Sequence, residues 1–228
     1  MKTNSNSYTI IYSAILVVIV AFLLAFVSQA LKAKQEVNVA LDQKKQILYS
    51  LNIRDLNDNE VEKTFKEVVK GKNTEYDKPE SNDAPNLGPA DPMDGKDGIY
   101  YCEVNGKQLK VFPLKGMGLW GGISGYISLT DDGTVYGAYF NHESETAGLG
   151  AEIKDNLEWQ QKFQGKKVFK EGVDGIALGV VKNVTDPETQ VDGVTGSTLT
   201  SDGVNNMLKD CLSKYIRVTK KFVPPVNK

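Results

Sequence analysis

The stretch Ile-Tyr-Tyr-Cys-Glu-Val-Asn-Gly-Lys-Gln-Leu-Lys-Val-Phe, residues 99–112, decides the fold class of this chain. Aromatic and β-branched side chains, which are common in strands, lie on both sides of Asn105-Gly106. An Asn-Gly pair favours the positive φ angles of a two-residue hairpin turn. The stretch therefore predicts two antiparallel strands, at 99–104 and 108–112.

More secondary structure is predicted between this hairpin and the C-terminus. Alternating and apolar runs predict strands, and apolar residues three and four positions apart predict helices. The expected elements are strands or extended segments at 123–129, 134–140 and 176–181, a helix at 152–164, and a C-terminal helix from Val204 to Ile216. We therefore expect residues 99–228 to form one α+β domain with an antiparallel sheet and flanking helices, large enough for one hydrophobic core.

The N-terminus predicts a membrane span. Residues 3–31 carry no charged side chain, and Tyr8–Val27 is a run of 20 predominantly apolar residues. At about 1.5 Å per helical residue, this run can cross a hydrocarbon core of roughly 30 Å. The alternative, a cleaved signal peptide, usually has an apolar region of only about 7 to 15 residues. The sequence therefore favours a transmembrane anchor at residues 1–31, and lysines on both sides leave its orientation undecided.

Residues 32–98 predict a helical stalk followed by a linker. Asn57, with Glu60 three residues later, is a capping-box pattern that begins a second helix. That helix is expected to place four apolar side chains on one face: Val61, Phe65, Val68 and Val69. Residues 71–98 contain four of the eight prolines, a composition that favours a linker.

The composition excludes several classes of function. The 27 Lys and Arg residues nearly balance the 29 Asp and Glu residues, so we expect no nucleic-acid partner. Cys102 and Cys211 lie far apart, which excludes a CxxC motif, and the single histidine, His142, argues against a zinc site built from several imidazoles. We expect no metal site, two buried thiols and a structural hydrogen bond for His142.

Three glycine-rich runs carry the functional hypotheses. The run 192–201 leads directly into the C-terminal helix. Its Ser and Thr residues fit a simple helix cap, but the first N–H groups of a helix can also hold a phosphate. The second run, Glu145–Gly150, is by itself only a tight turn. The third, Lys115–Gly122, places apolar side chains among glycines, which suits the covering of a planar ring, although its Trp120 also fits a core residue.

Together these runs resemble the FMN-binding domains of bacterial respiratory sodium and electron-transport complexes. The run 195–200, Thr-Gly-Ser-Thr-Leu-Thr, is similar to the S-G-A-T-x-T motif on which those domains carry FMN as a phosphoester. Residues 118–121 and the run from His142 to Glu152 resemble patterns of the C subunit of the sodium-translocating NADH:quinone reductase, and the similarity includes the N-terminal span. Three positions depart from the family pattern: Thr195 for Ser, Ser197 for Ala and Ala147 for Pro.

The resemblance implies an electron-relay subunit of a sodium-translocating NADH:quinone oxidoreductase, with no catalytic residue of its own and no activity alone. Its FMN would be joined to the last threonine of the motif, Thr200, whose hydroxyl we expect to be exposed. The expected flavin contacts lie in the three runs: Leu119, Trp120, Thr146, Gly148, Leu149, Thr195, Gly196, Ser197, Thr198 and Leu199. The implied partners are the other subunits of the complex and a flavin transferase. The implied location is the bacterial inner membrane, with the FMN-binding domain, residues 99–228, on the periplasmic side.

Two alternatives remain open on the sequence. The G subunit of an Rnf-type electron-transport complex shares the attachment motif, but not the Gly-Leu-Trp run. A non-redox, membrane-anchored binding module would use the Ser/Thr-Gly run only as a helix cap. Covalently bound flavin distinguishes both redox interpretations from the binding module.

Overall fold

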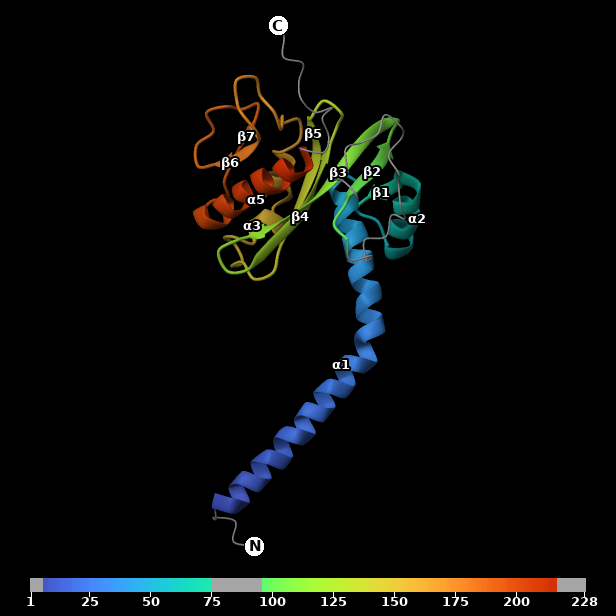
Figure 1. Cartoon of the computed structure of the whole chain (residues 1–228), viewed down its shortest axis with the longest axis vertical. Helices are drawn as coiled ribbons and strands as arrows, with labels where there is room; N and C mark the ends of the chain where they lie inside the picture. Colours follow the sequence, from blue (N-terminus) through green and yellow to red (C-terminus); the bar gives the residue numbers. More distant parts are fainter. Residues whose placement is uncertain (1–5, 75–95, 217–228) are drawn as a thin grey trace. The chain divides into compact units, whose positions relative to one another are not determined.

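The computed structural model describes residues 6–74 and 96–216 (Figure 1). The chain divides into two compact units, residues 1–42 and 43–228. Several residues of the sequence predictions lie outside the described part: Pro79, Pro85, Pro89 and Pro92 of the expected linker, and the side chains of Tyr215 and Ile216.

The N-terminal unit is formed by most of helix α1, Asn6–Ser50. Its apolar side chains are exposed along the predicted span, as at Ile10, Val18 and Phe22. An apolar helix surface that is exposed in the described part of the chain is typical of a segment that lies in lipid. This helix is long and apolar enough to cross a membrane, in agreement with the predicted anchor.

The last turns of α1 belong to the second unit. Ile47, Leu48 and Leu51 are at most 1 % exposed. In the same region the Ser128 hydroxyl of the sheet donates a hydrogen bond of 2.5 Å to the Ser50 carbonyl oxygen. The end of the predicted stalk is therefore part of a packed core.

Helix α2, Asp58–Val68, begins at the predicted capping box. The Asn57 side chain accepts a hydrogen bond from the Glu60 N–H at 3.1 Å, and the Glu60 carboxylate accepts one from the Asn57 N–H at 2.9 Å. Both ends of this reciprocal contact satisfy N–H groups that the helix itself cannot pair. Val61 and Phe65 are buried, as predicted.

Strand β1, Val69–Asn73, lies where we expected the end of a helix and the start of a linker. Val69 has an extended backbone, with φ −87° and ψ 111°, and pairs with Cys102 of strand β2, Ile99–Val104. The prediction of Val69 on the helix face is wrong because pairing with this distant strand overrides its local helical spacing. The boundary that we predicted at residue 98 stays a prediction.

Five antiparallel strands form the main sheet in the order β1-β2-β3-β4-β5. The strands after β2 are β3, Lys107–Met117, β4, Gly122–Leu129, and β5, Val135–His142. The turn at Asn105-Gly106 has the predicted positive φ angles, 51° and 74°. Strand β3 runs beyond its predicted end at Phe112, because it stays paired with β4 as far as Met117.

Two short helices follow the sheet, α3, Glu152–Asp155, and α4, Leu157–Gln161. We predicted one helix over 152–164. The helix is instead interrupted at Asn156, whose φ of −95° and ψ of 95° are extended. Its side chain accepts a hydrogen bond from the Trp159 N–H at 3.0 Å and so caps α4.

Strands β6, Gly179–Val181, and β7, Gln190–Asp192, form a small parallel pair before helix α5, Thr198–Ile216. Helix α5 lies across one face of the main sheet (Figure 1). Gly203 permits a close approach to β3, because a Cβ at this position would collide with the carbonyl oxygen of Met117.

The main hydrophobic core lies between the sheet and α5. Ile127 and Leu129 of β4 belong to this core, whereas Ser128 between them faces the end of α1, as the alternation of a strand requires. The sheet thus has α5 on one face and the end of α1 on the other. The predicted α+β domain, with an antiparallel sheet and flanking helices, is confirmed.

Candidate functional site

Three loops meet beside the start of α5. They are the turn between β3 and β4, residues 118–121, the loop after β5, residues 143–151, and the segment before α5, residues 193–197. The last two approach so closely that a Cβ on Gly196 would lie 2.8 Å from the Leu149 side chain. The structure therefore brings together the three glycine-rich runs that the sequence singled out.

The first turn of α5 separates its hydroxyl groups into exposed and buried ones. Thr198 and Leu199 are exposed, whereas Ser197, Thr200 and Ser201 are buried, with Thr200 0 % exposed. Because successive residues lie about 100° apart around a helix, the first two point to solvent, whereas Thr200 and Ser201 are turned into the interior of the domain. Our expectation that the Thr200 hydroxyl is exposed is wrong.

The Thr200 hydroxyl belongs to a buried chain of hydrogen bonds. It accepts from the Ser197 hydroxyl at 2.8 Å and donates to Glu145 Oε2 at 2.6 Å. Next to it, the Ser201 hydroxyl donates to the Ser197 carbonyl oxygen at 2.9 Å and accepts from the Val194 N–H at 3.0 Å. These bonds satisfy the buried hydroxyls and fix the backbone that leads into α5.

Glu145 is a buried carboxylate, 7 % exposed, that joins α5 to the β3–β4 turn. Besides the Thr200 hydroxyl, it accepts hydrogen bonds from the N–H of Trp120, at 2.9 Å, and from those of Leu119 and Gly121. Burial acts to raise the pKa of Glu145, but these hydrogen bonds outweigh burial and lower that pKa below its usual value. Glu145 is therefore ionised at neutral pH.

Exposed apolar side chains lie on the loops around this carboxylate. Leu119 is 44 % exposed, Trp120 66 %, Leu149 43 % and Leu199 60 %. Trp120 is therefore not a core residue, which was the alternative interpretation of its run. We call these four residues the apolar group. Large apolar side chains left exposed on converging loops are typical of surfaces that bind a ligand or a partner.

The loop after β5 is a hydrogen-bonded turn. The Thr146 carbonyl oxygen accepts from the N–H groups of Leu149, at 3.1 Å, and Ala151, at 3.0 Å. Gly148 takes a φ of 71°, which is unfavourable for other residues. The Thr146 side chain is exposed, so it is available to a ligand.

His142 and the two cysteines have structural surroundings. His142 Nδ1 accepts a hydrogen bond from the Glu145 N–H at 3.2 Å, the type of contact we expected. Cys211 Sγ lies 3.4 Å from the carbonyl oxygen of Lys115 and is buried, as is Cys102. Burial raises the pKa of Cys102 to about 12, so its thiol is unreactive. Within residues 6–74 and 96–216, no cluster of His, Cys, Asp or Glu could hold a metal ion.

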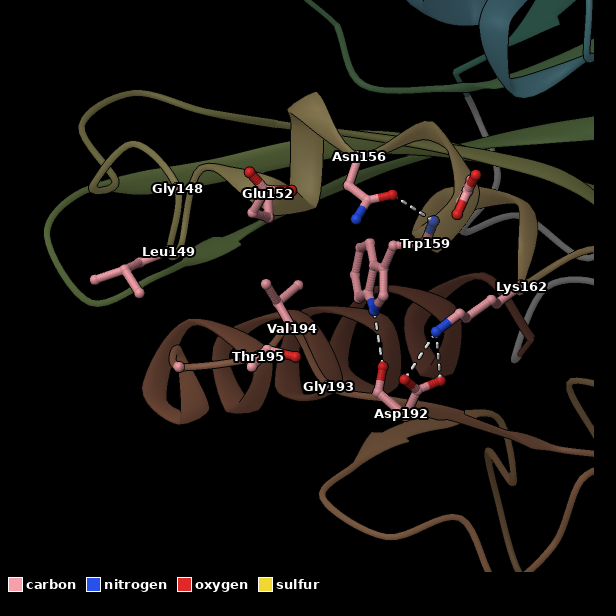
Figure 2. Close-up of a pocket in the computed structure, with 12 residues that line it drawn as sticks. Gly148, Leu149, Glu152, Asn156, Trp159, Lys162, Asp192, Gly193, Val194 and Thr195 are labelled. Atoms are coloured by element: carbon pink, nitrogen blue, oxygen red, sulfur yellow. Dashed lines mark hydrogen bonds and ion pairs between the residues drawn. The ribbon is translucent and has the colours of Figure 1, made fainter.

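A cleft of about 410 Å³ opens beside the start of α5, between α3–α4 and the segment after β7 (Figure 2). Its inner wall is Trp159, whose indole N–H donates to the Asp192 carbonyl oxygen at 2.7 Å. The Asp192 carboxylate in turn pairs with Lys162 at 2.8 Å. This volume lies within the range of small-molecule sites.

The cleft contains four of the residues predicted to contact a ligand: Gly148, Leu149, Thr195 and Gly196. The other predicted residues lie outside its lining, and Leu119, Trp120, Thr146, Thr198 and Leu199 among them are exposed. Sequence reasoning missed Glu145, Trp159 and Asp192. Glu145 could have been found as the charged residue that opens the second glycine-rich run, whereas Trp159 carried no signal beyond its place on an expected helix.

Known proteins resemble the chain over this region and beyond. A family model described as the FMN-binding domain matches residues 118–213. The C subunit of the Na(+)-translocating NADH-quinone reductase of Haemophilus ducreyi is 32 % identical over 232 residues, covering 90 % of this chain and 89 % of that protein. The crystal structure of the same subunit from Parabacteroides distasonis is 34 % identical, with a TM-score of 0.69, and covers 86 % of this chain and 98 % of that one.

Other relatives match over a shorter segment. The C subunit of the Pseudomonas aeruginosa reductase is 38 % identical over 123 residues, which is 51 % of this chain and 46 % of that protein. For the relatives from Chlamydia pneumoniae and Chlamydia muridarum, the matched segment covers 41 % and 38 % of their length. The chain thus spans less than half of the length of these three relatives.

Proposed function

Because this chain belongs to the family of the C subunits of Na(+)-translocating NADH-quinone reductases, we propose that it is an electron-relay subunit of such a complex. We propose that it carries FMN covalently. When bound, FMN supplies the electron-transfer chemistry, while the protein supplies binding, orientation and electrostatics. The oxidation of NADH, the reduction of quinone and the translocation of sodium are assigned to the assembled translocase, in which this chain acts together with other subunits.

The observation that carries this proposal is that Thr198, which bears a hydroxyl in the first turn of α5, is an exposed residue. The first N–H groups of a helix have no acceptor within the helix, and the dipole places partial positive charge there. A phosphate attached at Thr198 would therefore lie where its charge is stabilised. The residues present fit the phosphate of FMN.

Thr198 is a better acceptor than Thr200, which the sequence motif favoured. Attachment at Thr200 would require a hydroxyl that is 0 % exposed to leave its hydrogen bonds with Ser197 and Glu145. Breaking such buried contacts costs about 1–3 kcal/mol for each group left unpaired. Thr198, two residues earlier in the same motif, is exposed and needs no such rearrangement.

The attachment reaction forms one bond and breaks another without any change of oxidation state. Thr198 Oγ1 would lose its proton and bond to the phosphorus of FMN. FMN itself lacks a good leaving group, so the donor would be a pyrophosphate ester of FMN, a flavin dinucleotide. Cleavage of the pyrophosphate would release the second nucleoside monophosphate, in a reaction that we assign to a flavin transferase.

The flavin ring would lie against Leu149, which borders the cleft and also belongs to the apolar group. Leu119, Trp120 and Leu199 offer further apolar surface, and the Thr146 hydroxyl a polar contact. The backbone of residues 195–197 would lie next to the phosphate. A covalent bond would retain FMN in the periplasm, where we place the domain and where no cytosolic FMN pool could replace a lost cofactor.

Covalent flavin in the native host tests the proposal. The full chain is expressed with its flavin transferase, denatured, washed and separated on a gel. We expect a fluorescent band at the mass of the chain. A dark band would exclude the relay function and favour a non-redox binding module, in which the run before α5 is only a helix cap.

A further inference from the structure

We propose that Glu145 is the positioning residue of the attachment site: its carboxylate holds the start of α5 so that Thr198 presents its hydroxyl to the flavin transferase. The inference rests on the proposed function, because it concerns the same site. It goes beyond that function by assigning a role to a residue that would neither bind FMN covalently nor take part in electron transfer.

The position of Glu145 in the hydrogen-bond network supports this role. One carboxylate oxygen, Oε2, accepts from the Thr200 hydroxyl at 2.6 Å, and the other, Oε1, accepts from the Trp120 N–H at 2.9 Å. The same carboxylate thus contacts α5 and the β3–β4 turn, while its backbone belongs to the loop after β5. One side chain therefore connects all three loops of the site.

The packing around Glu145 leaves little room for its carboxylate to take another position. A Cβ on Gly150 would lie 2.5 Å from Glu145 Oε2 and 2.7 Å from Thr200 Oγ1. Any side chain larger than hydrogen at position 150 would displace the contact between Glu145 and α5. The glycine therefore allows the loop after β5 to bring its carboxylate against the helix.

The contact between Glu145 and Thr200 determines which way Thr198 faces. Thr200 and Thr198 are separated by about 200° around the helix, so fixing Thr200 toward Glu145 directs Thr198 away from the core. Without the carboxylate, the first turn loses the bond that sets this rotation. Since first turns of helices readily fray, we expect the hydroxyl of Thr198 to lose its fixed orientation.

The donors to Glu145 require an ionised carboxylate. A hydroxyl and backbone N–H groups all donate to it, and a carboxylate can accept several such bonds at once. In the variant Glu145→Gln, the amide keeps one oxygen but turns an NH₂ group toward donors. The side chain keeps its size, but one of its two hydrogen-bond acceptors is lost. The variant therefore separates the effect of hydrogen bonding from that of packing.

Glu143→Gln is the matched control. Glu143 lies in the same loop, is exposed, and accepts a hydrogen bond from the Gly122 N–H at 3.2 Å. The control makes the same chemical change two residues away, on a carboxylate that is hydrogen-bonded to Gly122 of β4.

The test follows flavin attachment to the detergent-solubilised full chain, with purified flavin transferase and flavin adenine dinucleotide. The initial rate is measured from the mass of the intact protein, and melting of the unmodified chain is recorded for each variant. We expect Glu145→Gln to lower the rate on the order of tenfold or more, because small displacements of a reacting group are costly. Glu143→Gln should react like the original chain.

Two variants of Thr200 provide a rescue experiment. Thr200→Ser keeps the hydroxyl that donates to Glu145 and should restore nearly the original rate. Thr200→Val keeps the size but not the hydroxyl and should react as slowly as Glu145→Gln. If Glu145→Gln does not fold, the comparison of these two variants decides the question.

Equal rates for the original chain and Glu145→Gln, or for Thr200→Val and Thr200→Ser, would overturn the role of Glu145. Absence of attachment in the original chain would instead refute the proposed function. The two failures are therefore distinguishable.

Discussion

Thr198 and Thr200 are the same residue type on the same helical turn, yet the surroundings of their hydroxyls are opposite. Thr198→Ala removes an exposed hydroxyl and should change the free energy of unfolding by no more than about 0.5 kcal/mol. It should abolish covalent FMN. Thr200→Ala removes a buried donor to Glu145 and should cost about 1–3 kcal/mol, while FMN still accumulates over long reaction times.

Mass spectrometry of the peptide that contains residues 191–209, together with urea unfolding, measures both effects. The two single variants serve as controls for each other. An FMN mass that persists in Thr198→Ala and disappears in Thr200→Ala would return the assignment to Thr200, the residue that the motif favoured. If the mass persists in both variants, Ser197 and Ser201 are the next candidates.

Gly150 makes a second prediction at the scale of single residues. A Cβ there would lie within 2.7 Å of both Glu145 Oε2 and Thr200 Oγ1, so Gly150→Ala should destabilise the unmodified protein by about 1–3 kcal/mol. Gly122→Ala is the control, because the atoms nearest to its Cβ would be the end of the exposed Glu143 side chain, which can move aside. Equal urea midpoints for the two variants would contradict the tight packing described for Gly150.

At the scale of elements, the carboxylate of Asp186 tethers the loop between β6 and β7 through hydrogen bonds. The Asp186 carboxylate accepts hydrogen bonds from Lys170 and from the Thr189 hydroxyl, both at 2.7 Å. These contacts, that with Lys170 first, lower the pKa of Asp186 to about 2. Because this pKa is lower in the folded than in the unfolded protein, the contribution of Asp186 to stability is present above pH 4 and is lost as the pH falls toward 2.

We expect Asp186→Asn to be less stable than the original chain at pH 6, and the difference to shrink between about pH 4 and pH 2. Urea midpoints measured across this range test the prediction. Comparing the two proteins removes the contribution of the other carboxylates. If the difference in urea midpoint between the two proteins does not depend on pH, Asp186 stabilises the loop through packing or through the loop backbone instead.

The cap and the turn set by neighbouring residues were predicted, whereas a strand that depends on a distant partner and a helix interruption at a single residue were not. The Asn57 capping box and the Asn105-Gly106 turn are set by residues within a few positions, and both are confirmed. Strand β1 forms by pairing with β2, which follows the predicted linker in the sequence. The sequence prediction therefore missed this strand. The interruption at Asn156 was missed although it is local: the Asn156 backbone N–H donates to the Glu152 carbonyl oxygen at the end of α3, and the Asn156 side chain caps α4.

The same distinction holds for the site. From its composition the Thr-Gly-Ser-Thr run fitted a helix cap as well as a phosphate site, and the family resemblance favoured the phosphate. Which of its hydroxyls is exposed depends on Glu145, 55 positions earlier, and no local pattern contains that contact. For this reason the exposure predicted for Thr200 from the sequence was wrong, while the predicted attachment segment stays a prediction.

At the scale of the whole molecule, the apolar part of α1 predicts an integral membrane protein. The full chain should remain in the pellet after alkaline carbonate extraction, since burial in lipid does not depend on ionic contacts. With the proposed periplasmic orientation, protease added to spheroplasts should digest the domain after Lys32. Digestion only in inverted vesicles would place the domain in the cytoplasm, and a cytoplasmic marker protein controls for leaking spheroplasts.

The second unit should fold without the membrane span, provided that the end of α1 is retained. A fragment from residue 33 keeps Ile47, Leu48 and Leu51, each at most 1 % exposed, whereas a fragment from residue 55 loses all three. Since each buried large apolar side chain contributes about 2–5 kcal/mol, the shorter fragment should be unfolded or strongly destabilised. Thermal melting of both fragments, followed by circular dichroism, compares their stability.

The longer fragment, loaded with FMN by the transferase, should accept electrons from a chemical reductant. It should show no NADH:quinone turnover. A rate of roughly 1 s⁻¹ or faster from the purified fragment would be enzyme-like and would contradict the assignment of those reactions to partner subunits.

The burial of both thiols makes the molecule convenient for site-specific labelling. Cys102 and Cys211 are the two cysteines of the sequence, and burial raises the pKa of each. A cysteine introduced on the surface, for example in place of Lys209, would therefore be the thiol that a maleimide dye or nitroxide reaches first. Distances from such a probe to labelled partner proteins could be followed in the membrane without removing any native cysteine.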